Sequence, residues 1–386
     1  MKLSGMKFVC CALLYFLFVS CGGKKTQSAD SYELGNTGKT KMFRLDDDVR
    51  YNAFYLYTFA DKQGKNYLSF LNYRTNQLLF YDWNTEDFLF KVELPAEGPN
   101  GVTQVSGYFV KDFDHMYVST YAYNGLLQVD TMGRVVQRIP YGTTSGGYKI
   151  LPSYTPSSHP YIAPISVGDG KMYITQQAVS RFHAVSDTPI SVVIDTLKQT
   201  CESLPMTYSL LTDEEMEAGN LQFSRIFDGK NFVYSFYVSE DVFVASEDHS
   251  DIRRVKVKSR YIDSSTEKQQ DTEQGPRLYL ELPRYGDLIY DPYRKVYYRF
   301  AYPKVSLDRN TNWWGKAVYG RKKFSVMVLD EDFHVVGETL FPEGIYNSFV
   351  FFVNEDGLYI SRDYKIGTAE QSEDYLTFEL FQLLKK

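Results

Sequence analysis

Short runs of β-forming residues alternate with turn residues along most of the chain. From about Lys41 onward, stretches rich in Tyr, Phe, Val, Ile and Leu are separated by Gly, Asp and Asn, and helical apolar spacing is almost absent. The exception is LLTDEEMEAG, in which Thr212 and Glu215 have the spacing of a capping box and Gly219 is placed to end a short helix. The pattern therefore predicts an all-β fold.

One short pattern recurs along the chain at nearly constant intervals. It consists of turn residues followed by an aromatic residue among β-formers, as in GKMYIT and DGLYIS. Intervals of roughly 50 to 65 residues are typical of repeat architectures and leave room for four strands in each copy. An aspartate that ends the third strand also recurs, and we interpret it as part of the following turn rather than as a metal ligand. The aromatic residues are Tyr67, Tyr117, Tyr173, Phe232, Tyr297 and Tyr359, and the aspartates are Asp82, Asp130, Asp195 and Asp330.

The repeats predict a six-bladed β-propeller of four-stranded blades, a ring that leaves only short, protected strand edges. The last repeat contains only three predicted strands before the sequence ends. The run KMFRL, Lys41–Leu45, precedes the first blade, and its pairing with the C-terminal run YLTFELFQLL would close the ring within the last blade. Two β-sandwich domains are the alternative, but they require neither a single period nor a spare strand.

The first thirty residues have the organisation of a secretory signal. Two lysines precede the apolar run Phe8–Val19, which is too short to span a bilayer, and Ser20 and Cys21 follow it. We therefore expect a lipoprotein signal peptide over residues 1–20, lipidation of Cys21, a flexible tether over 21–40 and a propeller over 41–386. A plain secretory peptide with a chance cysteine is the alternative.

The chain resembles a family of Bacteroidetes lipoproteins of roughly this length, whose wider structural relatives are TolB-like six-bladed propellers. The resemblance rests on FVSC, which ends at Cys21 and is similar to a lipobox, on the blade pattern, and on FSVMVLDEDFHVVGE and FFVNEDGLYIS. It implies a propeller fold and a lipid anchor in the outer membrane, and it implies no active residues. In that group, surface export goes with an acidic stretch after the lipidated cysteine. Because GGKK follows Cys21, the expected orientation is toward the periplasm rather than the cell surface.

Long connections are expected on one face of the propeller. The turns between strands one and two and between strands three and four share a face, and here they are short. The long segments fall in the other two kinds of connection, and loops that carry function gather on such rigid scaffolds. One stretch within them, Ser265–Arg277, has the composition of a solvated flexible loop and is expected to have no role. The long segments are 95–106, 140–161, 177–189, 205–221, 259–285, 303–322 and 363–374.

Candidate binding residues lie in or directly before these long segments. Adjacent Trp313 and Trp314 in DRNTNWWGKAVYGRKK interrupt the strand pattern, and one indole could stack on a sugar ring, a peptide or a partner protein. The alternative is that both tryptophans cap the apolar top of their own blade. The other candidates begin loops near the predicted central funnel, where they could bind a ligand or staple the loops: Arg181, His183, Arg362, Asp363 and Tyr364.

The charge, the histidine spacing and the cysteine content of the chain bear on which ligands and cofactors are expected. The formal charge of −6, without a basic stripe, argues against nucleic acid as a partner. The five histidines have no metal-ligand spacing, no known catalytic motif occurs, and neither a metal nor a cofactor is expected. Cys201 is the one cysteine beyond Cys21, and we interpret it as a small buried residue.

Two functional hypotheses remain open at this point. The first is a non-catalytic binding or scaffold propeller that presents its long connections to a glycan, a peptide or an envelope protein. The second is a carbohydrate-active hydrolase or lyase with its site in the central funnel, which would need two carboxylates at a set separation. We favour the first because nothing in the sequence nominates a nucleophile.

Overall fold

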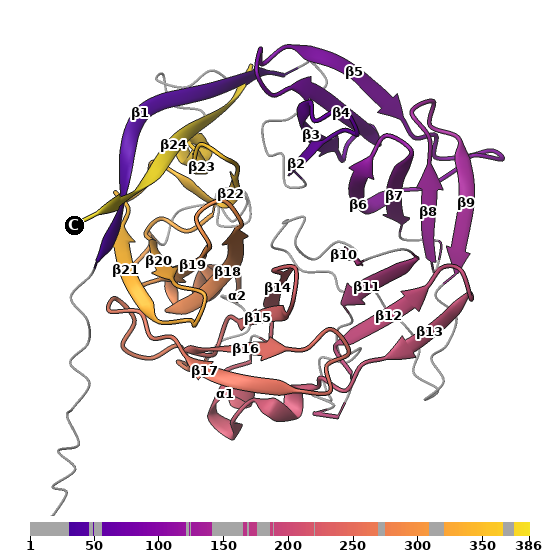
Figure 1. Ribbon diagram of the computed structural model, residues 1–386. Helices are drawn as coiled ribbons and strands as arrows, with labels where there is room; N and C mark the ends of the chain where they lie inside the picture. Colours follow the sequence, from indigo (N-terminus) through magenta and orange to yellow (C-terminus); the bar gives the residue numbers. More distant parts are fainter. Residues whose placement is uncertain are drawn as a thin grey trace, which may run out of the picture.

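The strands form a ring of β-sheets. The computed structural model describes residues 31–45, 49, 56–120, 123, 125–140, 165–167, 170–175, 186–187, 189–219, 221–268, 275–308, 320–365 and 374–386. Within these residues, four separate sheets have four strands each, a fifth sheet has eight, and the sheets stand around a common centre (Figure 1). The predicted all-β, propeller-like arrangement is confirmed.

Each four-stranded sheet is built from consecutive strands, and neighbours along the chain pair antiparallel. The first sheet contains β2 (Leu56–Ala60), β3 (Asn66–Asn72), β4 (Gln77–Asp82) and β5 (Phe88–Glu93). The second contains β6 (Val105–Asp112), β7 (His115–Thr120), β8 (Gly125–Val129) and β9 (Val135–Pro140). The third contains β10 (Ile165–Val167), β11 (Lys171–Thr175), β12 (Ser191–Asp195) and β13 (Thr200–Ser203). The fourth contains β14 (Phe223–Phe227), β15 (Phe232–Phe236), β16 (Asp241–Ala245) and β17 (Ile252–Lys256).

The eight-stranded sheet combines both ends of the chain. Its strands, in spatial order, are β18 (Arg284–Asp291), β19 (Val296–Tyr302), β20 (Ser325–Leu329), β21 (Val335–Leu340), β1 (Tyr32–Arg44), β24 (Tyr375–Lys385), β23 (Leu358–Ser361) and β22 (Asn347–Val353). A parallel contact with one register pair, Tyr32 opposite Gly337, joins β1 to β21. This contact makes one nearly closed sheet of β1 and the last seven strands, so the structure does not show the six separate blades predicted.

β1 pairs with the C-terminal strand, as predicted, but it starts earlier than expected. Phe43 lies opposite Leu376, and the antiparallel pairing with β24 continues across a register shift to Tyr32, opposite Lys385. Residues 32–40 therefore belong to the sheet, and the predicted tether boundary at residue 40 is wrong. The physical reason is that backbone hydrogen bonds to β24 hold this polar stretch in the sheet. It has almost no large apolar side chains, so its sequence shows no strand pattern.

The sequence repeat marks the second strand of each four-strand unit. The six repeated aromatic residues lie near the start of β3, β7, β11, β15, β19 and β23. The repeated aspartates accept backbone N–H bonds in turns, as Asp130 Oδ1 does from Met132 and Arg134. The same holds for Asp82, Asp195 and Asp330, so the turn interpretation is confirmed. No group of three His, Cys, Asp or Glu that could hold a metal occurs in the part of the chain that the structure describes.

Apolar side chains, many of them aromatic, fill the space between neighbouring sheet units. The rings of Phe300 on β19 and Phe351 on β22 stack with centroids 4.1 Å apart. Cys201 packs at the edge of such a cluster and is only partly buried. Desolvation raises the pKa of its thiol to about 12, which keeps Cys201 an unreactive thiol at neutral pH.

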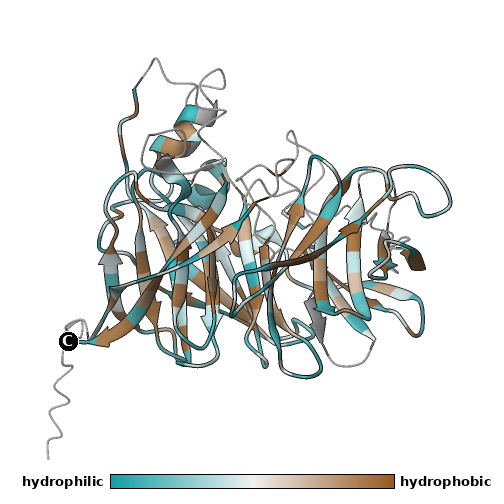
Figure 2. Cartoon of the chain, turned by 90° about the horizontal axis from the view of Figure 1, so that it is seen from above, coloured by the Kyte–Doolittle hydropathy of each residue, from teal (hydrophilic) through white to brown (hydrophobic). Residues whose placement is uncertain are grey.

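The two faces of the ring differ in their connections. The turns that join first to second strands and third to fourth strands are short wherever the two strands follow one another in the chain, and they form what we call the short-turn face. The remaining connections, including β13–β14, β17–β18 and β19–β20, form the long-connection face, from which the helices project at the top of Figure 2. The predicted segregation of long connections onto one face is confirmed for the connections that the structure describes.

The helical segments are short. α1 (Asp213–Glu217) has the predicted capping box between Thr212 and Glu215, and Gly219 beyond it has a positive φ of 81°. α2 (Gly275–Glu281), η2 (Tyr208–Leu210) and η4 (Asp363–Lys365) are absent from the sequence prediction. Among the described residues, none of these helices has the length and apolar character needed to cross a membrane.

Candidate functional site

The structure describes three of the predicted binding residues. Arg362, Asp363 and Tyr364 follow β23 on the long-connection face. The predicted lipidation site and the other predicted binding residues lie outside the described residues, and they are Cys21, Arg181, His183, Trp313 and Trp314.

Helix α2 holds the chain just before the tryptophan segment. The Leu307 N–H donates to Glu281 Oε1 at 2.7 Å, and Arg277 lies 2.9 Å from the same carboxylate oxygen. Arg277 also donates to the Leu307 carbonyl at 3.4 Å. Because α2 and Leu307 share these bonds, the segment 309–319 begins at a fixed point on the long-connection face.

Arg321 holds the chain just after that segment. Its guanidinium lies 4.6 Å from the ring centroid of Tyr279 on α2 and 5.1 Å from that of Tyr302 on β19. Its Nη1 donates to the Leu282 carbonyl at 3.2 Å, while its Nε has no partner among the described residues. Burial lowers the pKa of Arg321, which is 2% exposed. A buried arginine between two rings makes this end of the segment a second fixed point.

Gly320, next to Arg321, shows how closely this end packs. Its φ is +84°, and a Cβ there would lie 2.7 Å from the Ser348 backbone nitrogen. The Arg321 N–H donates to Ser348 Oγ at 3.0 Å, which ties the segment to the start of inner strand β22. Glycine is required here by both the left-handed conformation and the close approach.

Arg362 belongs to a polar cluster around Glu379 of β24. Its Nη1 lies 3.0 Å from Glu379 Oε1, Asn36 Nδ2 donates to Oε2 at 2.7 Å, and the Tyr346 hydroxyl also donates to Oε2. The Glu379 side chain is 10% exposed, so these donors compensate for the loss of water around a buried charge. Arg362 thus staples its loop to β24 and keeps part of its side chain exposed.

Asp363 and Tyr364 have different surroundings from Arg362. Asp363 is 4% exposed, and the Ser361 hydroxyl donates to its Oδ2 at 2.5 Å. Burial raises the pKa of the Asp363 carboxyl to about 7, against the effect of the Ser361 hydrogen bond. Burial also raises the pKa of Tyr364, whose ring lies near Gly344. The three residues share a face but do not converge on one described site.

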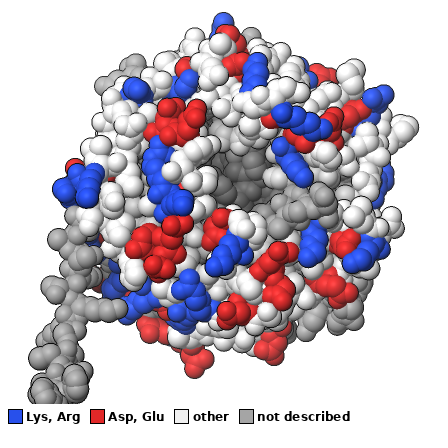
Figure 3. Space-filling model, viewed as in Figure 1, with Lys and Arg blue, Asp and Glu red and all other residues white. Residues whose placement is uncertain are grey.

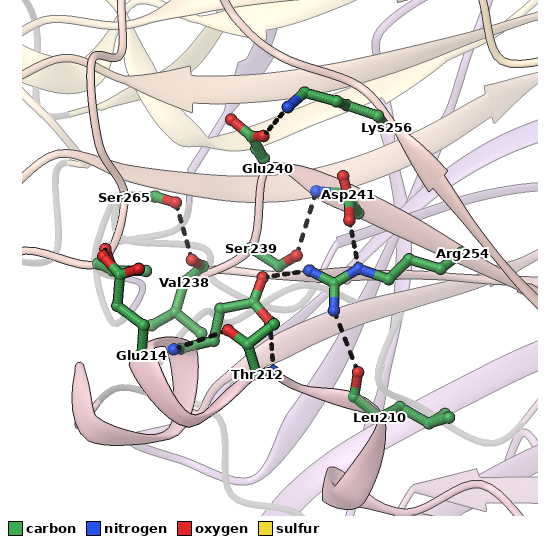
Figure 4. A network of polar contacts seen from close by, with 12 residues as sticks. Leu210, Thr212, Glu214, Val238, Ser239, Glu240, Asp241, Arg254, Lys256 and Ser265 are labelled. Atoms are coloured by element: carbon green, nitrogen blue, oxygen red, sulfur yellow. Dashed lines mark hydrogen bonds and ion pairs between the residues drawn. The ribbon is translucent and has the colours of Figure 1, made fainter.

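The chain after β17 is docked onto the fourth sheet. Ser265 Oγ donates to the Val238 carbonyl at 2.7 Å, and Arg254 pairs with Asp241 (Figure 4). Arg254 also lies 2.7 Å from Glu215 of α1. The expectation of a flexible loop over Ser265–Arg277 is wrong at both ends, because Ser265 is buried and α2 occupies the end. The interval 269–274 lies outside the described residues.

Sequence reasoning missed the buried arginines that join neighbouring sheet units. Arg225 on β14 is fully buried and donates to Ser191 Oγ at 3.1 Å and to the Tyr173 carbonyl at 2.9 Å, both in the third sheet. Arg299 on β19 reaches the fourth sheet in the same way. An arginine within a strand is ordinarily assigned to the solvent face, so a single sequence contains no signal for this role.

Charge is spread around the ring without one dominant sign. Figure 3 shows lysine and arginine side chains next to aspartate and glutamate side chains around a central hollow. Many are paired, as Lys65 is with Asp82 at 2.7 Å. On the face that Figure 3 shows, the described residues therefore form no continuous basic stripe of the kind that binding to a phosphate backbone requires.

Comparisons with known proteins identify relatives of the whole fold. The profile of the family described as a domain of unknown function, DUF4221, matches residues 31–340. The structure is similar to the crystal structure of a DUF4221 member from Bacteroides vulgatus, with 26% identity, a TM-score of 0.80, and coverage of 94% of this chain and 100% of that one.

A more distant similarity is to a predicted exported protein from Bacteroides fragilis. The identity is 12%, the TM-score is 0.52, and the alignment covers 94% of this chain and 97% of that one, so this likeness concerns the fold alone. No curated protein matches. Because its family profile spans most of the sequence, this chain belongs to the DUF4221 family.

Proposed function

We propose that this protein is a lipid-anchored envelope protein that binds a glycan, a peptide or an envelope protein through its long-connection face, without catalysis. The observation that carries the proposal is the fixing of both ends of the tryptophan segment, by α2 at Leu307 and by Arg321 at the start of β22. Loops that start and end on a rigid scaffold are a common place for binding residues, and this loop starts and ends at well-packed residues.

The ring is best understood as six blades. In the eight-stranded sheet, β18–β21 are consecutive antiparallel strands like those of the other sheets, and β22–β24 with β1 make the remaining four. The contact between these halves is parallel and has one register pair. We therefore count two blades joined at their outer edges, which supports a TolB-like six-bladed arrangement.

The position of β1 indicates on which face of the ring the proposed lipid anchor is attached. Ser31 donates its N–H to the Val336 carbonyl and accepts from the Lys386 N–H, which places it at the outer edge of the ring on the short-turn face. A chain from residue 22 to Ser31 reaches at most about 36 Å. A lipid on Cys21 would therefore attach the ring at its short-turn face, which leaves the long-connection face free to point away from the membrane. With GGKK after Cys21, we propose an outer-membrane anchor that faces the periplasm.

Asp363 supports a second candidate function, a carbohydrate-active hydrolase or lyase in the central funnel. Its carboxyl lies in the segment after β23 on the long-connection face, and burial raises its pKa, a shift found in general acids and also in carboxyls with a structural role. The described partners of this carboxyl are the Ser361 hydroxyl and the Thr377 backbone N–H, neither of which is a second carboxylate. We rank the binding function first for this reason.

Trp313→Ala/Trp314→Ala tests the binding face. If an indole stacks on the ligand, the double variant should bind envelope extract or a glycan array more than tenfold more weakly, with an unchanged melting temperature. Melting and binding are measured on the same sample. Trp83→Ala is the control for a core tryptophan, because Trp83 is 4% exposed and its loss should lower the melting temperature. A lower melting temperature with unchanged binding in the double variant would mean that both tryptophans stabilise the fold and do not contact the ligand, which would contradict the proposal.

Cys21→Ala tests the anchor. Lipid attachment needs the Cys21 sulfur, so the variant should lose all incorporation of labelled fatty acid and accumulate as unprocessed precursor. Ser20→Ala, which keeps a small residue before the cysteine, should be labelled as the parent is. Unchanged labelling of Cys21→Ala would rule out the lipoprotein assignment, and digestion by external protease on intact cells would rule out the periplasmic orientation.

A further inference from the structure

A pocket of about 260 Å³ opens on the short-turn face, where the first sheet meets the last strands of the ring. Its lining comes from three units: the β2–β3 turn region of the first sheet, the β18–β19 turn, and the end of β22. Small-molecule pockets commonly measure about 300–1,000 Å³, so this one has room for a single ring-sized molecule. The pocket lies on the face opposite the long connections. Ligand binding there would be independent of any binding at the long-connection face.

Aromatic rings form rigid walls around this pocket. Phe59 and Tyr67 stack with centroids 5.3 Å apart and an interplanar angle of 19°. Trp83 is fixed by edge contacts with Phe352 and Tyr359 at 5.2 and 5.1 Å. These contacts hold the walls in place before any ligand arrives, which lowers the entropic cost of binding.

Tyr293 adds an aromatic surface at the mouth of the pocket. It lies in the β18–β19 turn and is 60% exposed, the most exposed tyrosine among the described residues. A large exposed ring beside a concave site is a common means of covering the flat side of a ligand. In this pocket, Tyr293 is the ring available for stacking.

Three polar side chains of the lining have no hydrogen-bond partner among the described residues: Thr58, Asn66 and Glu355. Neighbouring polar side chains do have partners. The Tyr67 hydroxyl donates to Asp61 Oδ2 at 2.8 Å, and Asn354 Oδ1 accepts from the Asp356 N–H at 2.9 Å. A hydroxyl, an amide and a carboxylate are therefore available to a ligand in the same pocket. Together they offer both donors and acceptors.

The charges around the pocket favour a neutral ligand over an acidic one. The nearby cations are already paired, with Lys65 2.7 Å from Asp82, Lys41 3.3 Å from Glu86 and Arg294 2.9 Å from Asp291. Glu355 supplies a carboxylate without such a partner. A phosphate or carboxylate would therefore meet like charge, whereas a hydroxyl group could donate to Glu355.

We propose that this pocket binds one pyranose ring of a neutral saccharide. A pyranose has an apolar face of C–H groups, which would stack on Tyr293, and a rim of hydroxyl groups, which would bond to Asn66, Thr58 and Glu355. The pocket offers both a ring for stacking and polar side chains for hydrogen bonds, and its volume limits the ligand to about one sugar ring. The binding would be weak for a single sugar and would select the terminal residue of a chain.

Ligand-observed NMR on the full chain in detergent tests the proposal, with the methyl glycosides of glucose, galactose, mannose and N-acetylglucosamine as probes. At least one glycoside should bind, and Tyr293→Ala and Asn66→Ala should each weaken that binding at least tenfold. Tyr73→Ala is the matched control, because Tyr73 is 46% exposed but lies on the long-connection face, and it should bind as the parent does.

Other outcomes overturn the inference. Binding of choline or of glucuronate in place of every neutral glycoside would mean that charge, and not a neutral ring, is recognised. Glycoside binding that survives Tyr293→Ala but is lost in Trp313→Ala/Trp314→Ala would place the sugar site on the long-connection face. If no probe binds, the pocket is not a saccharide site. If only Tyr293→Ala and Asn66→Ala weaken binding, the saccharide site is in the pocket. This result would hold even if the long-connection face bound no ligand.

Discussion

Phe43→Ala is expected to lower the free energy of unfolding by about 3–5 kcal/mol, which is the usual cost of truncating a fully buried phenylalanine. Phe43 is 0% exposed and lies on β1, and its ring is 5.7 Å from Tyr81, 5.9 Å from Trp83 and 6.2 Å from Phe378. It therefore packs against both the first sheet and the C-terminal strand. The loss should be visible as a lower midpoint in urea unfolding followed by tryptophan fluorescence.

Met42→Ala is the matched control for Phe43→Ala. Met42 is the adjacent residue on the same strand and 43% exposed, and its backbone N–H keeps its bond to Glu86 in the variant. Its replacement should change the free energy of unfolding by no more than about 0.5 kcal/mol. Equal effects of the two variants would mean that β1 contributes only its backbone to the ring, and the account of Phe43 as a core residue would fail.

Arg299→Ala is expected to cost about 4 kcal/mol, because it leaves several buried acceptors without a donor. Arg299 is 0% exposed and lies 4.0 Å from the Tyr285 ring centroid. Burial lowers the pKa of its guanidinium to about 10, which leaves it charged at neutral pH. Its five acceptors are Ser235 Oγ and the carbonyls of Ser239, Glu240, Asp241 and Val257, at 2.7 to 3.2 Å.

Arg299→Lys separates charge from geometry. A lysine retains the positive charge but has three donors on one nitrogen, so it should recover only part of the stability. Lys256→Ala is the surface control, since Lys256 is 70% exposed in its pair with Glu240 and its replacement should leave the stability almost unchanged. Calorimetry of the three variants measures these differences. Full recovery by lysine would show that charge alone, and not the fork of donors, stabilises this junction.

Local patterns in the sequence were enough to predict the strand repeat and one helix. Tyr173 and its counterparts lie near the start of the second strands, and Thr212 and Glu215 form the capping box, because these features depend on neighbours a few residues away. The early start of β1 at Tyr32 escaped prediction because its pairing partner, β24, lies at the other end of the chain. A polar stretch has no apolar alternation from which to infer a strand.

The candidate site was less accessible to sequence reasoning than the fold. The sequence places Arg362 at the start of a loop, but its ion pair with Glu379 depends on β24 lying beside it. Asn66, Glu355 and Tyr293 come from three distant turns, and only the ring brings them to one pocket. Single-sequence patterns report on local spacing, whereas these juxtapositions are set by the order of the sheets around the centre.

The pairing of β1 with β24 also determines when folding can finish. Asn36 and Glu379, which bond across these strands, are 343 positions apart in the sequence. During synthesis β1 is made before the four-stranded sheets and β24 is made after them, so these sheets can assemble while the ring stays open. Contacts of such long range slow folding, because loop closure precedes the gain from pairing. An incomplete chain would therefore carry an unpaired strand at each end, and premature termination would yield an open, aggregation-prone product.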